Sequence, residues 1–357
     1  MDAKSPKVKE RPTVSVVVAC RNEAAAIEDC LYSLLKQAPV RGGFEVLVVD
    51  GMSIDGTREK LRTLADQDPR VIVFDNPRLS SAAGFNVGVS AARGEYIAIV
   101  GAHNRYSRDY LRKCLDVALR TGADNVGGAP RIEGEGLVAR AVALAHHSWL
   151  SVGGARWHDP DYEGQADTVF GGFYKREVFD RLHGYDEAML RTEDDEFNLR
   201  LRKLGGTIYC SPKIRSWYSP RRSLRAVFAQ YLQYGYYRVA VIKKHGRPAS
   251  LRQIMPALCL SSWICAVVVG IFSRISLAIA LVAALTYTIV VAATSLRFIL
   301  SLKGNAFSAD TGRVFLATMA VFVCFHVGYA CGFIVGAFDL VRGRLGQRQR
   351  FQRLTRN

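Results

Sequence analysis

Acidic residues stand at two places in this chain where a carboxylate could do chemistry. Asp50 directly follows the apolar run Phe44–Val49, and Asp194 lies in the acidic stretch Glu193–Glu196. A carboxylate at the end of a buried strand can accept hydrogen bonds from a base N–H or from ribose hydroxyls. Clustered acids tend to raise the pKa of one member, which suits it to take a proton from an attacking hydroxyl. The two positions are therefore candidates for hydrogen bonding to a ligand and for acid–base chemistry.

Both positions also have ordinary structural uses. An Asp before a Gly, as in Asp50-Gly51, is typical of a turn, and Asp55 is placed to cap a helix that starts near Thr57. Acidic residues at a helix N-terminus interact favourably with the helix dipole, which would account for Glu193–Glu196. For Asp194 this structural use is compatible with catalysis, and Asp195 remains the rival base.

The surrounding chain alternates short apolar runs with helical patterns. The apolar runs, which are typical of strands buried on both faces, are Val14–Ala19, Phe44–Val49, Val71–Phe74 and Tyr96–Val100. This alternation predicts right-handed crossovers and an α/β, doubly wound sheet. Ligands of such sheets bind beyond the carboxyl ends of the strands. We therefore expect 20–23, 50–55 and 101–104 to share one rim.

Several motifs occur in a fixed order along this part of the chain. They occupy Val17–Glu23, Val48–Thr57, Ala92–His103, Phe170–Phe179 and Thr192–Glu196. In this order they resemble the inverting family 2 glycosyltransferases, in particular the branch of succinoglycan-biosynthesis glucosyltransferases. The resemblance covers about residues 14–238. It implies a GT-A type doubly wound mixed sheet with a Rossmann-like nucleotide-binding half, followed by C-terminal transmembrane helices.

The resemblance also assigns roles to individual residues. It implies an in-line displacement with inversion, in which the base that deprotonates the acceptor hydroxyl is Asp194 or Asp195. Binding of the nucleotide sugar is implied for Ala19, Arg21, Glu23, Asp50, Asn86, Ala102 and His103. Contact with the acceptor and the diphosphate is implied for Gly171, Gly172, Glu193, Gln230 and Arg238.

One departure from the family pattern concerns the metal. The family ends this strand with Asp-x-Asp or Asp-Ala-His, whose carboxylates hold Mg²⁺ or Mn²⁺ against the diphosphate. Here the sequence is Gly101-Ala102-His103, which leaves His103 as the one metal ligand of the motif. A single imidazole suits Mn²⁺ better than Mg²⁺. Either His103 and the diphosphate hold the ion together, or nearby cations replace it, and the sequence leaves both open.

A second departure lies downstream. The family carries Gln-x-x-Arg-Trp or a similar motif, whose Arg and aromatic residue help to hold diphosphate and acceptor. The match here begins at Gln230 and has Gln233 at the Arg position, followed by Tyr234. Arg238, one helical turn on, could supply the missing cation, as could Arg221 or Arg222. A solvated basic face is an equally good interpretation of these arginines.

The second half of the chain is basic and apolar. The net charge is +16, and no Asp or Glu occurs between Phe197 and Ala309. The basic residues flank apolar segments, which indicates a membrane partner and no nucleic acid. The segments 254–272, 275–296 and 314–338 each approach the length that crosses a bilayer, and 225–244 is predicted to be a helix on the membrane surface.

The predicted organisation follows from these shifts in composition. We expect a basic N-terminal tail (1–13), a GT-A domain (14–225), a basic juxtamembrane helix (226–252), a membrane region with two or three transmembrane helices (253–338) and an Arg-rich tail (339–357). The positive-inside rule puts both the catalytic half and the tail on the cytoplasmic side, whereas three crossings would separate them. Either the first segment does not cross or the tail breaks the rule. The predicted location is the inner cell membrane, multi-pass, with a cytoplasmic catalytic domain.

The predicted function combines these expectations. The chain would transfer a sugar, glucose by resemblance, from a UDP-sugar donor to a lipid-linked, polyprenyl-type acceptor in exopolysaccharide biosynthesis. One alternative is a degenerate, non-catalytic assembly subunit, because both departures touch the diphosphate end. The other is a processive polysaccharide synthase, against which the missing Gln-x-x-Arg-Trp counts.

Overall fold

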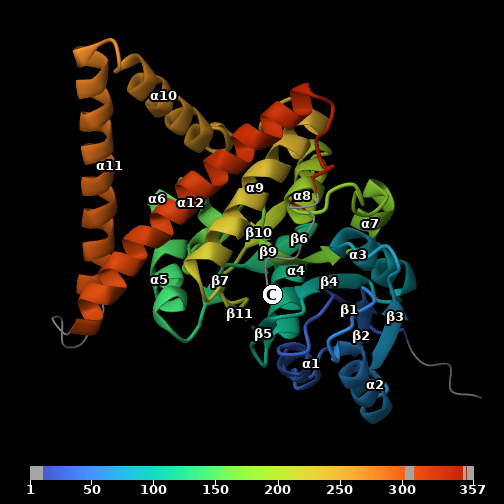
Figure 1. The fold of residues 1–357 in the computed structure, drawn as a ribbon. Helices are drawn as coiled ribbons and strands as arrows, with labels where there is room; N and C mark the ends of the chain where they lie inside the picture. Colours follow the sequence, from blue (N-terminus) through green and yellow to red (C-terminus); the bar gives the residue numbers. More distant parts are fainter. Residues whose placement is uncertain (1–10, 302–308, 349–350, 352–357) are drawn as a thin grey trace, which may run out of the picture. The chain divides into compact units, whose positions relative to one another are not determined.

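The computed structural model describes residues 11–301, 309–348 and 351 (Figure 1). The chain divides into two compact units that interleave along the sequence. Unit 1 comprises Met1–Arg131, Asp159–Ala188 and Glu193–Tyr218. Unit 2 comprises Ile132–His158, Met189–Thr192 and Ser219–Asn357. The domain boundaries expected from composition stay a prediction.

Unit 1 is built on an eight-stranded mixed sheet of order β3-β2-β1-β4-β9-β6-β10-β8. The first four strands in this order are parallel to one another, and β9 is antiparallel to both of its neighbours. The sheet confirms the predicted doubly wound α/β architecture. The bounds of its strands are β1 Val14–Cys20, β2 Phe44–Asp50, β3 Val71–Asp75, β4 Tyr96–Gly101, β6 Asn125–Gly128, β8 Gly164–Gln165, β9 Phe170–Lys175 and β10 Ile208–Cys210.

Helices cover both faces of this sheet, which is why its central strands are apolar throughout. Val14, Val16 and Val18 of β1 belong to a core cluster shared with α1 and α4. Val17 points the other way, so that a Cβ built at Gly88 of α3 would lie 2.3 Å from its Cγ1. A strand buried on both faces needs apolar residues at every position. The helices of unit 1 are α1 Ile27–Leu35, α2 Thr57–Gln67, α3 Ser81–Ala91, α4 Tyr110–Thr121, α7 Arg176–Leu182 and α8 Glu193–Lys203.

A small second sheet, of order β5-β11-β7, follows the carboxyl end of β4. Its strands are β5 Asn104–Tyr106, β7 Pro130–Ile132 and β11 Ser216–Tyr218. The pairing of β5 with β11 is antiparallel. These three-residue strands are too short to leave a periodic pattern in the sequence, so sequence reasoning did not predict them.

Unit 2 is helical. Its elements are α5 Leu137–His146, α6 Trp149–Val152, η1 Arg156–His158, α9 Leu224–His245, η2 Leu251–Gln253, α10 Met255–Val269, α11 Arg274–Ser301 and α12 Ala309–Val341. Figure 1 shows α9 and α12 lying alongside each other. Ser223 caps α9 by accepting a hydrogen bond from the backbone N–H of Ala226. The expected surface helix over 225–244 is therefore a well-capped helix, and it packs along α12 over much of its length.

The contact between α9 and α12 depends on a glycine stripe, defined here as Gly328, Gly332 and Gly336. A Cβ built at Gly332 would lie 1.9 Å from the carbonyl oxygen of Leu232, and one built at Gly336 would lie 2.8 Å from that of Tyr236. Glycines four residues apart let two helix backbones approach closely. Because the partners on the two helices advance in the same direction, α9 and α12 run parallel.

Two described helices are long and apolar enough to cross a membrane. They are α11 and α12, whose most apolar windows have mean hydropathies of 2.4 and 2.0. The window of α11 is 11% buried in the protein, but that of α12 is 50% buried. The first predicted segment, 254–272, forms the shorter helix α10 of 15 residues. The apolar C-terminal helices are consistent with membrane association.

Candidate active site

The carboxyl ends of β1, β2 and β4 form one rim in unit 1. The register pairs Cys20 with Asp50 and Ala19 with Gly101. The three segments that leave these strands therefore start side by side, as the strand pattern predicts. This site rim consists of 20–23, 50–55 and 101–104.

Backbone contacts join the first two segments of the site rim. The backbone N–H of Asn22 donates to Ser53 Oγ at 2.8 Å, and Asn22 Oδ1 accepts from the backbone N–H of Ile54 at 3.0 Å. The backbone N–H of Glu23 donates to Thr57 Oγ1 at 2.9 Å. Asn22 has a φ of 54°, a value that Asn tolerates better than most residues. These contacts fix the direction of the Glu23 side chain.

Glu23 meets His103 across the site rim. The distance between Glu23 Oε1 and His103 Nδ1 is 3.1 Å, and both side chains are partly exposed. The ring of Tyr218, on β11, contacts His103 edge-on with centroids 5.8 Å apart. A carboxylate on Nδ1 sets the tautomer and orientation of an imidazole. The pair therefore presents His103 in a defined orientation at the end of β4.

Asp50 is 1% exposed and its carboxylate is firmly held. Oδ1 accepts from Ser53 Oγ at 2.5 Å, and Oδ2 pairs with Arg58 Nη1 at 3.0 Å. Arg58 also pairs with Asp75, at the end of β3, at 2.8 Å. Burial opposes the charge of Arg58, but the two carboxylates outweigh it and raise the Arg58 pKa. Sequence reasoning found Asp50 but missed Arg58, because nothing in the spacing shows that α2 turns this side chain towards β2 and β3.

Asp55 has a structural use, as expected by default. Its Oδ1 accepts from the backbone N–H and the hydroxyl of Thr57, at 3.1 and 2.6 Å, and Oδ2 accepts from the backbone N–H of Ala24 at 3.1 Å. Burial would raise the pKa of Asp55, but these hydrogen bonds lower it. The side chain thus orders the start of α2.

The structure gives a physical reason for Gly101, the first departure from the family pattern. A Cβ at this position would lie 2.5 Å from Nδ2 of Asn104, which is 3% exposed. The Tyr106 hydroxyl accepts from the backbone N–H of Gly101 at 2.9 Å and lies 3.3 Å from its carbonyl oxygen. The space beside Gly101 is therefore filled by Asn104, and sequence reasoning missed both partners.

Gly171 and Gly172 lie on β9 beside the end of β4. Ala98 pairs with Phe173, which brings the preceding glycines next to the carboxyl end of β4. Gly171 has a φ of 69°, and a Cβ there would lie 2.9 Å from the carbonyl oxygen of Ile99. This close approach requires glycine, and it gives β9 a bare backbone next to the site rim.

Asp194 lies in the first turn of α8, in unit 1. Its Oδ1 accepts from the backbone N–H of Asp195 at 2.8 Å, and the side chain is exposed. Burial first, and then the charge of Asp194, raise the pKa of the buried Tyr174 hydroxyl. Asn198 Oδ1 accepts from Tyr174 at 3.1 Å and from Asn125 Nδ2 at 3.0 Å, which fixes α8 to the sheet. Asp194 is thus a charged group on a rigid support.

Asn86 is engaged in holding a loop. Its Nδ2 donates to the carbonyl oxygen of Tyr185 at 2.9 Å and to Glu187 Oε1 at 3.0 Å. Its Oδ1 accepts from the backbone N–H of Tyr185 at 2.8 Å. These bonds use both ends of the amide, so the contacts of Asn86 tie α3 to the loop before α8 and lie apart from the site rim.

The remaining predicted binding residues fall into two groups. Ala102 lies on the site rim and Ala19 lies on β1 directly before it, and the Arg21 side chain lies over Gly51, with 3.2 Å between its Cβ and a Cβ built there. Within the described residues, Arg21 Nε has no hydrogen-bond partner. Gln230 and Arg238 are on α9 in unit 2, where Gln230 Nε2 donates to the Tyr234 hydroxyl at 2.9 Å. Glu193 opens α8.

The side chains present fit a divalent metal ion poorly. Among the residues that the structure describes, no group of three or more His, Cys, Asp or Glu side chains could hold an ion. Asp50 is already paired with Arg58, and Asn104 fills the place of the usual first aspartate. His103 and Glu23 remain as two potential ligands.

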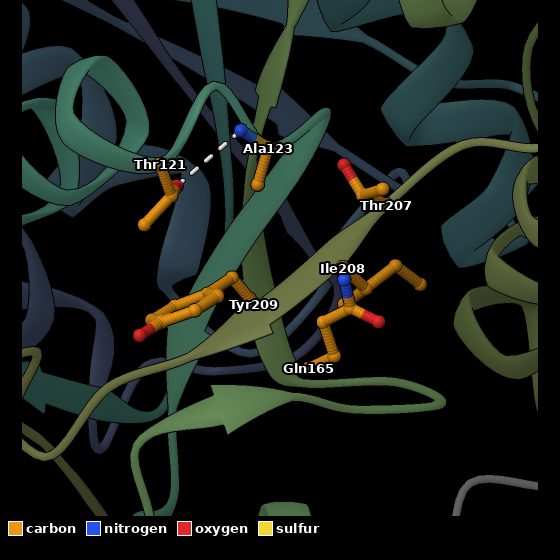
Figure 2. Close-up of a pocket in the computed structure, with 6 residues that line it drawn as sticks. All are labelled: Thr121, Ala123, Gln165, Thr207, Ile208 and Tyr209. Atoms are coloured by element: carbon orange, nitrogen blue, oxygen red, sulfur yellow. Dashed lines mark hydrogen bonds between the residues drawn. The ribbon is translucent and has the colours of Figure 1, made fainter.

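A shallow pocket of about 270 Å³ lies elsewhere in unit 1 (Figure 2). It is lined by Thr121, Ala123, Gln165, Thr207, Ile208 and Tyr209. Gln165 ends β8, and the other five residues lie around the starts of β6 and β10. β6 and β10 run parallel to β4 because β9 is antiparallel to both β4 and β6. The pocket is thus at the amino ends of the strands, on the opposite edge from the site rim.

Comparison with known proteins identifies the family to which the chain is similar. A family model described as glycosyl transferase family 2 matches residues 15–183. The succinoglycan biosynthesis protein ExoA of Rhizobium meliloti is 34% identical over 270 residues, which cover 72% of this chain and 82% of that protein. A dolichyl N-acetyl-alpha-D-glucosaminyl phosphate diacetamido-dideoxy-glucuronosyltransferase of Methanococcus voltae is 25% identical over 65% of this chain and 74% of its own length.

A solved structure supports the fold. The mannosyltransferase PcManGT of Pyrobaculum calidifontis, in complex with GDP-Man and Mn²⁺, is similar with a TM-score of 0.55 and 20% identity, over 94% of this chain and 88% of that one. The mixed sheet and its rim therefore define a glycosyltransferase of GT-A fold. With the extent of its match to ExoA, the chain belongs to glycosyltransferase family 2. The predicted family, fold and enzyme class are confirmed.

Proposed function

We propose that this glycosyltransferase moves a single sugar from a UDP-sugar to a lipid-linked acceptor, with inversion at the anomeric carbon. The observation that carries the proposal is the convergence of Glu23, Asp50 and His103 on one rim, next to the bare backbone of Gly171. Nucleotides bind at this edge of doubly wound sheets. A donor diphosphate and sugar would lie across the rim towards Gly171.

The donor would be held by residues of unit 1. Asp50 is oriented by Ser53 and Arg58, and its carboxylate would accept from the uracil N–H in place of the weak contact with the Cys20 thiol. The Arg21 side chain, which lies over Gly51 on the rim, would bind the diphosphate through its guanidinium group. His103, oriented by Glu23, would donate to a phosphate oxygen or ligate a cation.

Asp194 would act as the general base. The acceptor hydroxyl would lose its proton to the carboxylate as its oxygen forms the new bond to the anomeric carbon. The bond from that carbon to the diphosphate oxygen would break on the opposite side, and UDP would leave. The fixed position of α8, held through Asn198, supports this role, and Asp195 would keep a structural role at the helix start.

The acceptor and the location follow from the relatives and the apolar helices. Relatives are named for succinoglycan biosynthesis and for transfer to a dolichyl-linked sugar. A lipid-linked, polyprenyl-type acceptor of an exopolysaccharide pathway would lie at the membrane that the apolar helix α11 would enter. The protein would reside in the inner membrane with its catalytic unit in the cytoplasm. Glucose is the proposed sugar.

A metal ion has a subordinate place in the proposal. Mg²⁺ or Mn²⁺, if bound, would neutralise charge on the leaving diphosphate. His103 and Glu23 are the side chains that could contact it, with the diphosphate supplying further oxygen ligands. The base and the binding residues act in the same way with or without the ion.

Turnover by the membrane-embedded full chain tests the proposal. A panel of UDP- and GDP-sugars is supplied with a lipid-linked acceptor extract, with and without EDTA. We expect one UDP-sugar to be consumed and each acceptor to gain one sugar. Membranes without the protein are the control, and the EDTA series measures what the ion contributes.

Three results would contradict the proposal in whole or in part. Failure to consume any donor in either condition would indicate a non-catalytic assembly subunit. Repeated addition to the same acceptor would indicate a processive synthase. Consumption of a GDP-sugar alone would overturn the assignment of the donor.

A further inference from the structure

The apolar helices of unit 2 differ in what surrounds them. On α10 and α11, large apolar side chains are exposed on most sides, including Ile264, Val268, Ile279 and Leu285. On α12, one side faces protein along nearly the whole helix. Length and hydropathy alone select α11 and α12 as membrane helices. The exposure of their apolar side chains instead favours α10 and α11 as the membrane helices.

α12 packs on α5 and α9, and Val291 of α11 also joins its buried cluster. Asp310, near its start, pairs with Arg140 of α5 at 2.8 Å. Ala317, Val321, Phe322 and Phe325 share a buried cluster with α5 residues Ala141, Val142 and Ala145. The glycine stripe then packs on the backbone of α9. Contacts therefore follow α12 from its first turn onward.

The end of α12 is also held by polar groups. Asp339 is buried and pairs with Arg348 at 2.5 and 2.6 Å, and it accepts from the Tyr236 hydroxyl at 3.1 Å. The backbone N–H of Gly346 donates to the same hydroxyl at 2.9 Å. This network ties the chain after α12 back to α9.

Helices that pack side by side over many turns lie at the same depth relative to a membrane. If α12 crossed the bilayer, α9 would enter the hydrocarbon with it. Along its contact with α12, α9 carries Arg225, Gln230, Gln233 and Arg238. Arginine is strongly disfavoured within the hydrocarbon. The side chains of α9 therefore argue against a transmembrane α12.

The pair α10 and α11, with the turn 270–273 between them, has the opposite character and is called here the apolar hairpin. Two of its polar groups are satisfied within it: Trp263 Nε1 donates to the carbonyl oxygen of Ala280 at 3.0 Å, and the Ser276 hydroxyl donates to that of Ala266 at 2.9 Å. The Tyr287 hydroxyl of α11 instead lies 2.9 Å from Nδ1 of His326 on α12. Arg274, at the turn, is the one charged residue between Arg252 and Arg297. Internal satisfaction of polar groups is what a lipid environment demands.

The dimensions of the hairpin also suit a bilayer. The 15 residues of α10 extend about 22 Å, compared with a hydrocarbon core of about 30 Å. The long side chain of Arg274 can extend from the turn to bring its charge to the far headgroups. Arg252 precedes the hairpin on the near side.

We infer that the apolar hairpin enters the phospholipid bilayer from the catalytic face and returns to it, whereas α12 stays out of the bilayer as a core helix of unit 2. Both ends of α12 then lie on the catalytic face. This arrangement puts the catalytic unit and the Arg-rich tail on one side. It satisfies the positive-inside rule that three crossings would break.

Cysteine labelling in sealed, uniformly oriented vesicles tests the inference. The background replaces Cys259, Cys265, Cys324 and Cys331 by alanine, and the other four cysteines are buried. Single cysteines are then placed by Gln67→Cys, Gly312→Cys, Val341→Cys and Leu285→Cys. Gln67 is exposed on α2 and marks the catalytic face, and Gly312 and Val341 are exposed near the two ends of α12.

A membrane-impermeant maleimide should label Gln67→Cys, Gly312→Cys and Val341→Cys from the same face. Leu285→Cys should be labelled from neither face. Labelling of Val341→Cys from the opposite face alone would mean that α12 crosses, and would overturn the inference. Labelling of Leu285→Cys as readily as Gln67→Cys would show that the hairpin lies in water, which would also overturn it.

A matched pair of substitutions tests whether lipid covers the exposed side chains of the apolar hairpin. Leu285 on α11 and Leu316 on α12 are 61% and 65% exposed. Leu285→Arg should lower the fraction of protein retained in carbonate-washed membranes, and Leu316→Arg should leave it unchanged. Equal losses of membrane retention in the two variants would contradict a position of α12 outside the bilayer. A change from dimer to monomer by Leu285→Arg, with membrane retention intact, would assign this surface to a second copy.

Discussion

Unit 1 and unit 2 are stabilised by different means. In unit 1, an in-register parallel sheet brings charged side chains together at one edge, and each of them is oriented by a neighbour, as Asp50 is by Arg58. In unit 2, helix backbones touch through the glycine stripe, and charged pairs such as Asp339–Arg348 stand at the ends. The first arrangement is suited to bind and position small polar groups, whereas the second holds helices together.

This difference between the units predicts which substitutions should alter catalysis and which should alter stability. A change of charge at Glu23 or His103, at the edge of unit 1, should alter catalysis with little effect on folding, because these two side chains are partly exposed. Addition of a single methyl group in unit 2 should alter stability, because the backbones leave no room for it. Substitutions at the edge of unit 1 should therefore lower turnover more than stability, and substitutions in the glycine stripe of unit 2 should lower stability more than turnover.

The largest expected effect is on the proposed base in unit 1. Asp194→Asn keeps the size of the side chain but cannot take a proton, so turnover should fall by about 10²–10⁴-fold while donor binding is kept. Initial rates and donor binding by titration measure the two effects. Asp195→Asn is the matched control and should retain most activity. Near-normal turnover by Asp194→Asn, or a larger loss in Asp195→Asn, would contradict the assignment.

The next effect concerns packing in unit 2. Gly332→Ala places a Cβ 1.9 Å from the carbonyl oxygen of Leu232, so α9 and α12 must separate. We expect the free energy of unfolding to fall by about 1–3 kcal/mol. Hydrogen exchange at the amides of α9 and α12 in the detergent-solubilised chain measures the change and locates it.

The matched control lies on the same helix. A Cβ at Gly312 would meet nothing within 4 Å, so Gly312→Ala should be neutral or stabilise the protein by up to about 1 kcal/mol through helix propensity. Equal effects of the two substitutions would mean that α9 and α12 do not touch at the glycine stripe in solution.

The same contrast explains what could be predicted from the sequence. The site rim was predictable because buried parallel strands have a recognisable composition and their carboxyl ends share an edge, so Asp50 and His103 could be placed without coordinates. Arg58 and Asn104 were not predictable. Each acts through a partner brought near by helix packing or by a short hairpin, and no periodic pattern records such contacts.

In unit 2, hydropathy predicted the apolar helices but not their partners. The segments 254–272 and 314–338 look equally fit to cross a membrane, yet only the first is exposed on most sides. The spacing of Gly328, Gly332 and Gly336 is visible in the sequence and was the one available signal that α12 packs on another helix. About a hundred residues separate α12 from its partner α9, and a sequence pattern does not show contacts between segments so far apart.

The smallest expected effect tests a charge of unit 1 that lies away from the site rim. Glu45 is buried near the amino end of β2, where its carboxylate accepts from Ser15 Oγ at 2.7 Å and from Arg93 Nη2 at 2.6 Å. Burial alone would raise the pKa of Glu45, but the hydrogen bonds from Arg93 and Ser15 outweigh it and lower the pKa below the usual 4.5. The folded state thus favours the ionised form.

The sign of the pH dependence follows from this lowered pKa. The stabilisation by Glu45 is fully present above its ordinary pKa and is lost as the pH falls through the lower value of the folded state. Glu45→Gln should therefore lower the free energy of unfolding by about 1–3 kcal/mol at pH 7, and the difference from the parent should shrink below pH 4.5. Urea unfolding at several pH values measures it, with exposed Glu59→Gln as the control. A difference that is constant with pH would show that shape, not the charge of Glu45, stabilises this end of the sheet, and turnover should be unaffected in either case because the site rim lies at the opposite edge.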